Sequence, residues 1–332
     1  MSTINILSDI ELEELKGVLD EWCEVTSRKQ ITLVTAGRSD AGKSTLIGNM
    51  LQLKGDHAPE RRYQPSSTTT EVKTYTNTVN GVEVRIIDTP GLAASDVNEA
   101  RIIAELQAES GGKAHMLLYC ISLLPSSKID EQDANVIKTL KVAFGPDIWG
   151  HAILVLTFAN TVMTFLERGQ TFSGVVQDYA TKFESILRSQ CPSFSVCSIF
   201  SCDQKEIKRD LSTVIALPAG IDPKQELVEG MKWDDSIYME VLKKCNPDAI
   251  PALLKVREPT SEMAMLALKL EFYTKIAFDS VIATAIAATG GRMGALVARE
   301  TFRSIKKRLE SFRKRLDDER ELKALRKDMK QN

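Results

Sequence analysis

Residues 32–45 read TLVTAGRSDAGKST, and this stretch decides the fold of the chain. A short apolar segment runs into Gly37, and Gly42, Lys43 and Ser44 complete the motif Gly-x-x-x-x-Gly-Lys-Ser/Thr. Glycines let the backbone curl until its N–H groups point at phosphate oxygens, and the helix that follows adds its positive N-terminal end. The stretch therefore predicts a strand, a phosphate-binding loop and a helix in succession.

Each position of this loop has an expected role. We expect Lys43 to reach the β- and γ-phosphates of a nucleotide and the Ser44 hydroxyl to ligate Mg²⁺. The whole loop should surround the phosphates; its residues are Gly37, Arg38, Ser39, Asp40, Ala41, Gly42, Lys43, Ser44 and Thr45.

A second motif, Asp88-Thr89-Pro90-Gly91, follows the alternating segment VEVRII. An acidic residue at the end of a second strand supplies the carboxylate that the Mg²⁺ shell needs, so Asp88 is a predicted metal-binding residue. Gly91 would let the backbone approach the γ-phosphate closely.

Between the two motifs, TYTNTV and VEVRII flank Asn80-Gly81 and predict a β-hairpin. An antiparallel edge strand at this place is typical of switch-type GTPases. The preceding threonines, 68–70, offer hydroxyls that could bind Mg²⁺ when a γ-phosphate is present, and Thr69 is the candidate. Alternatively, these threonines only begin the strand.

The remaining pattern alternates buried strands with amphipathic helices, which predicts a mostly parallel sheet with its ligand at the carboxyl ends of the strands. The predicted fold is α/β: a three-layer P-loop GTPase fold with a mostly parallel six-stranded sheet, one antiparallel edge strand and a helical C-terminal extension. The segment 156–160, LTFAN, should then lie at the nucleotide rim. The predicted segments are strands at 114–123, 151–158 and 194–200, and helices at 130–144 and 175–189.

Four segments carry a family resemblance: GRSDAGKST, DTPGL, the run from DEQDANVIKTL through FGPDIW to LVLT, and ALPAG near residue 216. Over roughly residues 31–256 the chain resembles the septin-like (TRAFAC class) GTPases. Within that class it is most similar to the immunity-associated GIMAP and avirulence-induced proteins and to the Toc chloroplast import receptors.

The resemblance implies that Thr157 and Asn160 read the base, because the family places a Thr-x-x-Asp motif, or a looser version of it, there. A carboxylate accepts two hydrogen bonds from guanine, whereas the Asn160 amide accepts one. Losing one such bond weakens binding by about 1–3 kcal/mol, so we expect guanine to be preferred less stringently. Asn160 could instead only cap the turn. A last base-contacting loop is expected near residues 201–203.

The resemblance also bears on hydrolysis. Many GTPases place a glutamine after the Gly91 position to orient water, but Leu92 stands here, so hydrolysis should be slow. Some family members receive an arginine across a dimer, and Lys128 aligns with that arginine; Arg38 is a second candidate. Lysine lacks the bidentate fork, and Lys128 could simply be an exposed charge. The candidate catalytic residues are Lys43, Thr69, Gly91 and Lys128.

Composition and the flanking segments complete the predicted organisation. The domains expected are an N-terminal amphipathic helix (1–26), a G domain (27–256) and a helical extension (257–332). A net charge of −2 gives no reason to expect nucleic-acid binding. The apolar run 280–291 is shorter than the ~20 residues that span a membrane. Residues 303–332 carry 12 Lys and Arg against 6 Asp and Glu, which suits an anionic membrane surface, a partner helix or a solvated helix.

These features lead to a working hypothesis and two alternatives. The hypothesis is a cytoplasmic protein, with peripheral membrane contact as an option, that binds GTP or GDP with Mg²⁺ and hydrolyses GTP slowly. Turnover would be coupled to a homodimer or oligomer formed through the nucleotide face, and the protein would act as a switch or scaffold. The first alternative is a nucleotide-binding interaction protein with negligible turnover, and the second is an NTPase of relaxed base specificity.

Overall fold

The computed structural model describes residues 30–51, 71–91, 99–124, 127–162, 164–166, 170–192, 214–222, 226–228, 231–245 and 249–256, with isolated positions nearer both ends. The chain divides into two compact units. Residues 30–246 form one unit, and residues 2–29 together with 247–332 form the other.

The first unit is built on a six-stranded sheet with the strand order β2-β3-β1-β4-β5-β6. Only the β2–β3 pair is antiparallel, and the other four pairs are parallel. The predicted sheet type is therefore confirmed. The strands are β1 (Gln30–Gly37), β2 (Lys73–Val79), β3 (Val82–Asp88), β4 (Met116–Ser122), β5 (Ala152–Thr157) and β6 (Ile215–Pro218).

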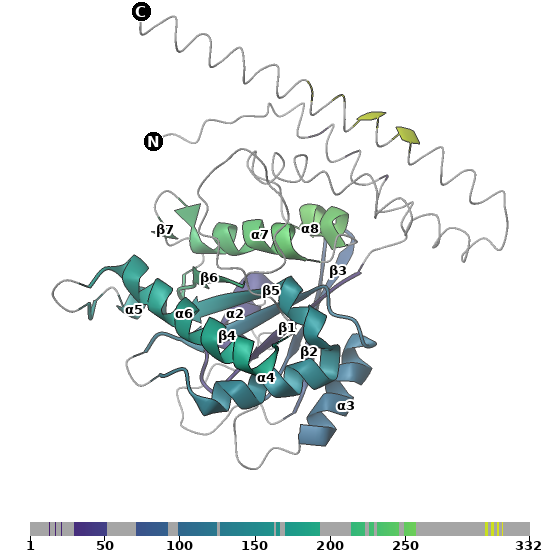
Figure 1. Ribbon diagram of the computed structural model, residues 1–332. Coiled ribbons are helices and arrows are strands. Elements are labelled where there is room, and N and C mark those ends of the chain that lie inside the picture. The colour runs from purple at the N-terminus through teal and green to yellow at the C-terminus, as the bar shows by residue number, and fades with distance from the viewer. Residues whose placement is uncertain are drawn as a thin grey trace, which may run out of the picture. The chain divides into compact units, whose positions relative to one another are not determined.

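Helices cover both faces of this sheet (Figure 1). Helices α3, α4 and α6 lie together on one face, while α2 and α7 lie on the other. A short two-stranded sheet, β7 (Glu226–Val228) with β8 (Met231–Lys232), precedes α7. The helical segments are α2 (Lys43–Met50), α3 (Glu99–Ser110), α4 (Glu131–Phe144), the 3-10 helix η2 (Pro146–His151), α5 (Ala159–Val162), α6 (Phe172–Gln190) and α7 (Trp233–Lys244).

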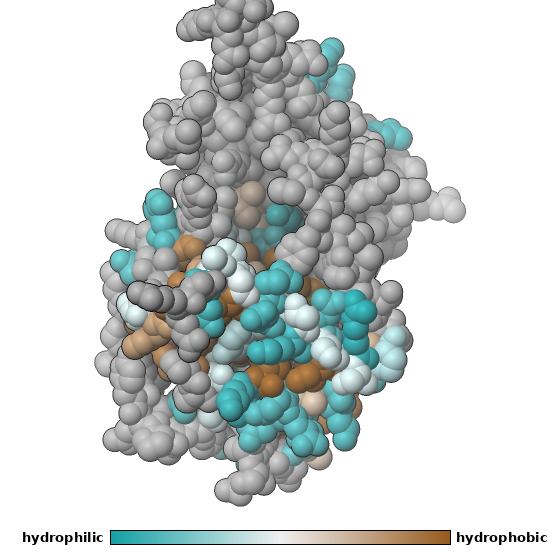
Figure 2. All heavy atoms as spheres, turned by 60° about the vertical axis from the view of Figure 1, so that its left-hand side comes forward, coloured by the Kyte–Doolittle hydropathy of each residue, from teal (hydrophilic) through white to brown (hydrophobic). Residues whose placement is uncertain are grey.

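The central strands form the core because they are covered on both faces. All seven residues of β4 and all six of β5 are buried, which matches their continuous apolar sequences. Trp149 of η2 is fully buried, and its ring packs near the rings of Tyr119 and Phe183. Trp233 is also buried and donates its indole N–H to the carbonyl of Asp222. On one side of the molecule, hydrophilic residues cover much of the described surface, with smaller hydrophobic patches between them (Figure 2).

The predicted hairpin is present. Strands β2 and β3 pair in register from Lys73↔Asp88 to Val79↔Val82. Asn80 and Gly81 between them have φ values of 50° and 77°, the left-handed pair that a tight two-residue turn requires.

The sixth strand comes from a different segment than the one expected. We predicted it at residues 194–200, which lie outside the described residues. The place beside β5 is taken by β6, whose Ile215 to Pro218 pair in parallel with Ile153 to Leu156. β6 was not predicted because it is a short, half-buried strand, whereas 194–200 has the apolar composition of a central one.

The second unit is described at few positions. Helix α8 spans Ile250–Val256, and Arg308 forms an ion pair with Glu21, which links the two chain ends within this unit. Within the described residues, no helix combines the length and apolar character needed to cross a membrane.

Candidate nucleotide-binding site

The phosphate loop lies where β1 ends, and glycine is required at both of its ends. Gly37 has a φ of 141°, and a Cβ there would lie 2.3 Å from the carbonyl oxygen of Cys120 on β4. Gly42 has a φ of 77° and precedes the first turn of α2, with Thr157 in close contact. Gly37 excludes a side chain sterically and Gly42 disfavours one by its positive φ, so the loop's curvature follows directly from the motif.

Lys43 is buried at the base of this loop. Its Nζ donates hydrogen bonds to the carbonyl oxygens of Gly37 (3.2 Å) and Arg38 (2.8 Å). Burial lowers the pKa of Lys43, and the nearby Asp88 carboxylate opposes that effect. A desolvated ammonium inside a ring of backbone groups is suited to bind an anionic oxygen, because low polarity strengthens the attraction.

Ser44 and Asp88 form the expected metal-binding pair. The Ser44 hydroxyl lies 3.4 Å from Asp88 Oδ2, and Thr35 Oγ1 donates to Asp88 Oδ1 over 3.2 Å. Asp88 is fully buried; burial raises its pKa, and the positive charge of Lys43 counteracts the rise. A buried carboxylate at the carboxyl end of β3 and a hydroxyl in the first turn of α2 are oxygen ligands of the kind that Mg²⁺ takes, so the residues present fit this ion.

Gly91 brings the second motif against the phosphate loop. A Cβ at Gly91 would lie 2.8 Å from the backbone nitrogen of Ser39 and 1.9 Å from its hydroxyl oxygen. The Asp88–Gly91 segment therefore packs directly against Ser39 of the phosphate loop, and the approach of Gly91 to a γ-phosphate stays a prediction.

Thr157 at the end of β5 contacts the phosphate loop. Its hydroxyl lies 2.8 Å from the carbonyl oxygen of Ala41 and 3.2 Å from that of Ile121, and it can donate its one proton to either. The side chain thus ties β5 to the loop.

Asn160 is the second residue of α5, just beyond the turn that follows β5. Its Oδ1 is buried and has no hydrogen-bond partner among the described residues. Phe158 in the turn has a φ of 57°, a left-handed conformation that is strained for an aromatic residue. An unpaired buried acceptor costs free energy unless a ligand or water satisfies it, so Asn160 retains its place as a candidate base-reading residue.

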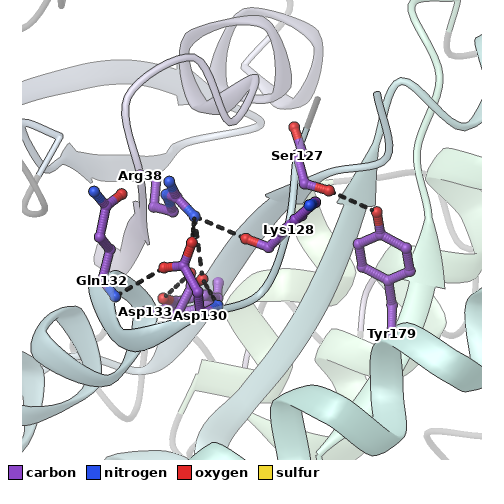
Figure 3. Close-up of polar contacts among 8 residues, drawn as sticks. Arg38, Ser127, Lys128, Asp130, Gln132, Asp133 and Tyr179 are labelled. Atoms are coloured by element: carbon purple, nitrogen blue, oxygen red, sulfur yellow. Dashed lines mark hydrogen bonds and ion pairs between the residues drawn. The ribbon is translucent and has the colours of Figure 1, made fainter. Parts of the chain in front are cut away.

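Arg38 and Lys128, the two candidate basic residues for hydrolysis, meet at the N-terminal end of α4 (Figure 3). The Arg38 guanidinium donates to the carbonyl oxygen of Lys128 (2.7 Å) and to Asp130 Oδ2 (3.1 Å). The Lys128 side chain is exposed. Arg38 is thus engaged within its own chain, and the segment that carries Lys128 borders the phosphate loop.

Other predicted site residues lie outside the described residues: Thr69, Leu92 and the proposed base loop at 201–203. Residues 219–222, which follow β6, were not predicted at the site. The Ala219 backbone exchanges hydrogen bonds with Leu156 and Ala159, so this segment adjoins the turn before Asn160. The ALPAG sequence near residue 216 was the signal in the sequence from which the position of this segment could have been predicted.

Comparisons with known proteins agree with this geometry. The AIG1 family model matches residues 31–191. The Translocase of chloroplast 34 homolog of Chlamydomonas reinhardtii is 29% identical over 46% of this chain and 41% of its own length. GTP-binding protein A of Dictyostelium discoideum is 31% identical over 49% of this chain and 34% of its own. Immune-associated nucleotide-binding protein 13 of Arabidopsis thaliana is 27% identical over 59% of this chain and 52% of its own length. The chain thus spans about a third to a half of these curated relatives.

Among solved structures, Toc33 of Arabidopsis thaliana in complex with GDP and Mg²⁺ has a TM-score of 0.50 and 17% identity, covering 75% of this chain and 93% of its own. A dimerization-deficient mutant of Toc33 also has a TM-score of 0.50, with 17% identity over 71% of this chain and 91% of its own. This likeness shows a P-loop GTPase fold, and the Toc33 complex names two of the predicted cofactors, GDP and Mg²⁺. Residues 31–191 thus match the AIG1 family, and the likeness to Toc33 supports the fold alone.

Proposed function

We propose that this protein binds GTP and GDP with Mg²⁺ and hydrolyses GTP slowly, in a reaction coupled to association of two copies through the nucleotide face. The observation that carries the proposal is the buried Lys43 ammonium inside the glycine-bounded loop, with Ser44 and Asp88 beside it. Backbone N–H groups and Lys43 would hold the phosphates, and Ser44 and Asp88 would hold the metal.

The chain's own residues supply limited help for hydrolysis. Leu92 follows Gly91 and cannot orient water by hydrogen bonding. Unassisted small GTPases turn over at rates on the order of 10⁻⁴ s⁻¹, and we expect a similar rate for the isolated protomer. Lys128, which is exposed and whose carbonyl bonds Arg38 of the phosphate loop, would supply a positive charge to a second copy.

Single-turnover GTP hydrolysis measured over a range of protein concentrations tests this proposal. A rate constant that rises with concentration supports association-coupled hydrolysis. Lys128→Ala should remove that rise, while Lys113→Ala, a substitution of another exposed lysine, should not. A rate constant that stays flat at every concentration would refute the coupling.

A second candidate function, nucleotide binding with negligible turnover, is favoured by Leu92 and by the engagement of Arg38 within its own chain. In that case GTP stabilises an assembly without being consumed. The same measurement separates the two candidates, because a bound but unhydrolysed nucleotide gives no phosphate at any concentration.

Base preference is tested at Asn160. Its single unpaired acceptor matches one guanine donor, so guanine should be preferred with reduced stringency. Asn160→Asp adds an acceptor and should tighten GDP binding by about 5- to 150-fold, corresponding to one hydrogen bond of about 1–3 kcal/mol. Competition of GTP, ATP and XTP for the site measures the stringency, and a preference for ATP would contradict guanine binding.

For location, we propose a cytoplasmic protein whose basic segment 303–332 contacts anionic membrane surfaces. The full chain should co-sediment with vesicles that contain phosphatidylserine, and the form without residues 303–332 should stay in the supernatant. Equal sedimentation of both forms would argue against membrane contact.

A further inference from the structure

The Arg38 side chain leaves the phosphate loop and ends at the N-terminal end of α4 (Figure 3). One nitrogen, Nη1, donates hydrogen bonds to the Lys128 carbonyl oxygen at 2.7 Å and to Asp130 Oδ2 at 3.1 Å, and it lies within ion-pair distance of Asp133 Oδ2 at 3.7 Å. The Arg38 side chain is 30% exposed, while that of Asp133 is only 2% exposed. The ion pair with Asp133 is therefore partly shielded from solvent, whereas Asp130, with a side chain 47% exposed, forms a surface ion pair with Arg38.

The same two carboxylates start helix α4. Asp130 is its N-cap and accepts from the Gln132 N–H, while Asp133 Oδ2 accepts from the Asp130 N–H, which closes a capping box. Asp133 is anchored in the core because Tyr119 donates its hydroxyl proton to Oδ1 over 2.9 Å. A movement of Arg38 thus acts directly on the hydrogen bonds that hold the first turn of α4.

The segment that carries Lys128 is held from its other side as well. Tyr179 of α6 donates its hydroxyl proton to the Ser127 carbonyl oxygen over 3.1 Å. Residues 127–130 therefore run between two fixed points, Tyr179 and Arg38, and the exposed Lys128 lies between them.

The backbone of Arg38 is tied to the phosphate site itself, since its carbonyl oxygen accepts from Lys43 Nζ at 2.8 Å. A phosphate oxygen competes with this carbonyl for the Lys43 protons. We propose that Arg38 is a positioning residue: through Asp130 and the Lys128 carbonyl it couples nucleotide occupancy to the conformation of residues 127–130, and so places Lys128. This proposal rests on nucleotide binding as proposed above.

Hydrogen exchange of the full chain, followed by mass spectrometry of peptides covering 127–135, tests the coupling with and without saturating GDP and Mg²⁺. Asp130→Ser keeps a capping hydroxyl but loses the carboxylate that holds Arg38. Arg38→Met keeps the apolar stem and loses the guanidinium. Arg85→Gln is the matched control, because Arg85 forms a comparable ion pair with Glu109 away from this loop.

In the unmodified protein, GDP should change the exchange rate of these peptides by about two- to fivefold, the range that one partly exposed ion pair supports. Arg38→Met and Asp130→Ser should each abolish this change, the double variant should lose no more than either, and Arg85→Gln should retain it. If Arg38→Met or Asp130→Ser keeps the GDP-dependent change in exchange, the coupling is wrong. It is also wrong if GDP saturates the unmodified protein and exchange in these peptides does not change. Failure of GDP to saturate it would instead refute the proposed function.

Discussion

Replacing Gly37 by alanine tests whether the phosphate loop's geometry is a packing constraint or only a preference. Gly37 has a φ of 141°, a region that residues with a side chain rarely adopt. An added Cβ would lie 2.3 Å from the Cys120 carbonyl oxygen, and that oxygen belongs to a backbone paired into the sheet. The loop, the strand or both must move to accept the methyl group.

The two effects add to a sizeable loss of stability. Backbone strain of this kind costs about 1–3 kcal/mol. Forcing a methyl group into a close-packed site costs about 1–3 kcal/mol more. We therefore expect Gly37→Ala to lower the free energy of unfolding by about 2–6 kcal/mol. Gly81 provides the control, because it has a φ of 77° but no atom lies within 4 Å of the place that a Cβ would take. Gly81→Ala should cost only about 1–2 kcal/mol, the strain of a left-handed conformation.

Urea unfolding at 25 °C, followed by far-ultraviolet circular dichroism, compares the two variants with the unmodified chain. Because only Gly37→Ala creates a clash, it should be less stable than Gly81→Ala by at least about 1 kcal/mol. If the two variants lose stability equally, the close approach of Gly37 to Cys120 does not contribute, and the steric explanation is wrong.

Buried groups near the site support three more predictions. Lys43→Ala should weaken GDP binding by more than about 100-fold, since charge-assisted hydrogen bonds to phosphate are each worth about 1.5–3 kcal/mol. Titration calorimetry measures the affinity, and an unchanged affinity would mean that the loop does not bind phosphate. Burial raises the pKa of the Cys120 thiol to about 12. In the native state at pH 8 it should thus react with iodoacetamide about 1000-fold more slowly than an ordinary thiol, and rapid peptide-resolved labelling would contradict its burial. Burial also raises the pKa of the Asp133 carboxyl, so the folded chain binds the carboxyl proton more tightly than the unfolded chain does. The contribution of this carboxyl to stability therefore falls as pH rises from about 4 through the folded pKa. In urea unfolding, the free energy of unfolding of the unmodified chain should fall relative to that of Asp133→Asn as pH rises over that window. A relative increase would show that the pKa of Asp133 is not raised.

Local sequence was sufficient to predict those structural elements whose conformation depends on residues close together in the chain. The Gly37–Ser44 motif and the Asn80-Gly81 turn are defined by backbone conformations that only particular residues adopt, so both were predicted. The helix over residues 131–144 was predicted from its apolar spacing. By contrast, α3 was not predicted as an element, although its buried Ile102 and Leu106 have helical spacing, because its other residues are mostly polar.

Contacts between distant segments could be found only in the folded chain. The sequence places Arg38 in the phosphate loop, but its pairing with Asp130 joins residues 92 positions apart. Likewise, the Thr157 hydroxyl bonds to the Ala41 carbonyl over 116 positions. The pairing of Ile215 to Pro218 with β5 was not predicted, because a short strand depends on the space left at the sheet more than on its own composition. The sequence by itself determined the phosphate chemistry and the class of fold, since these depend on local backbone conformation and hydrophobic pattern. Tertiary structure alone decided where the Arg38 and Lys128 groups meet, since such contacts arise from packing.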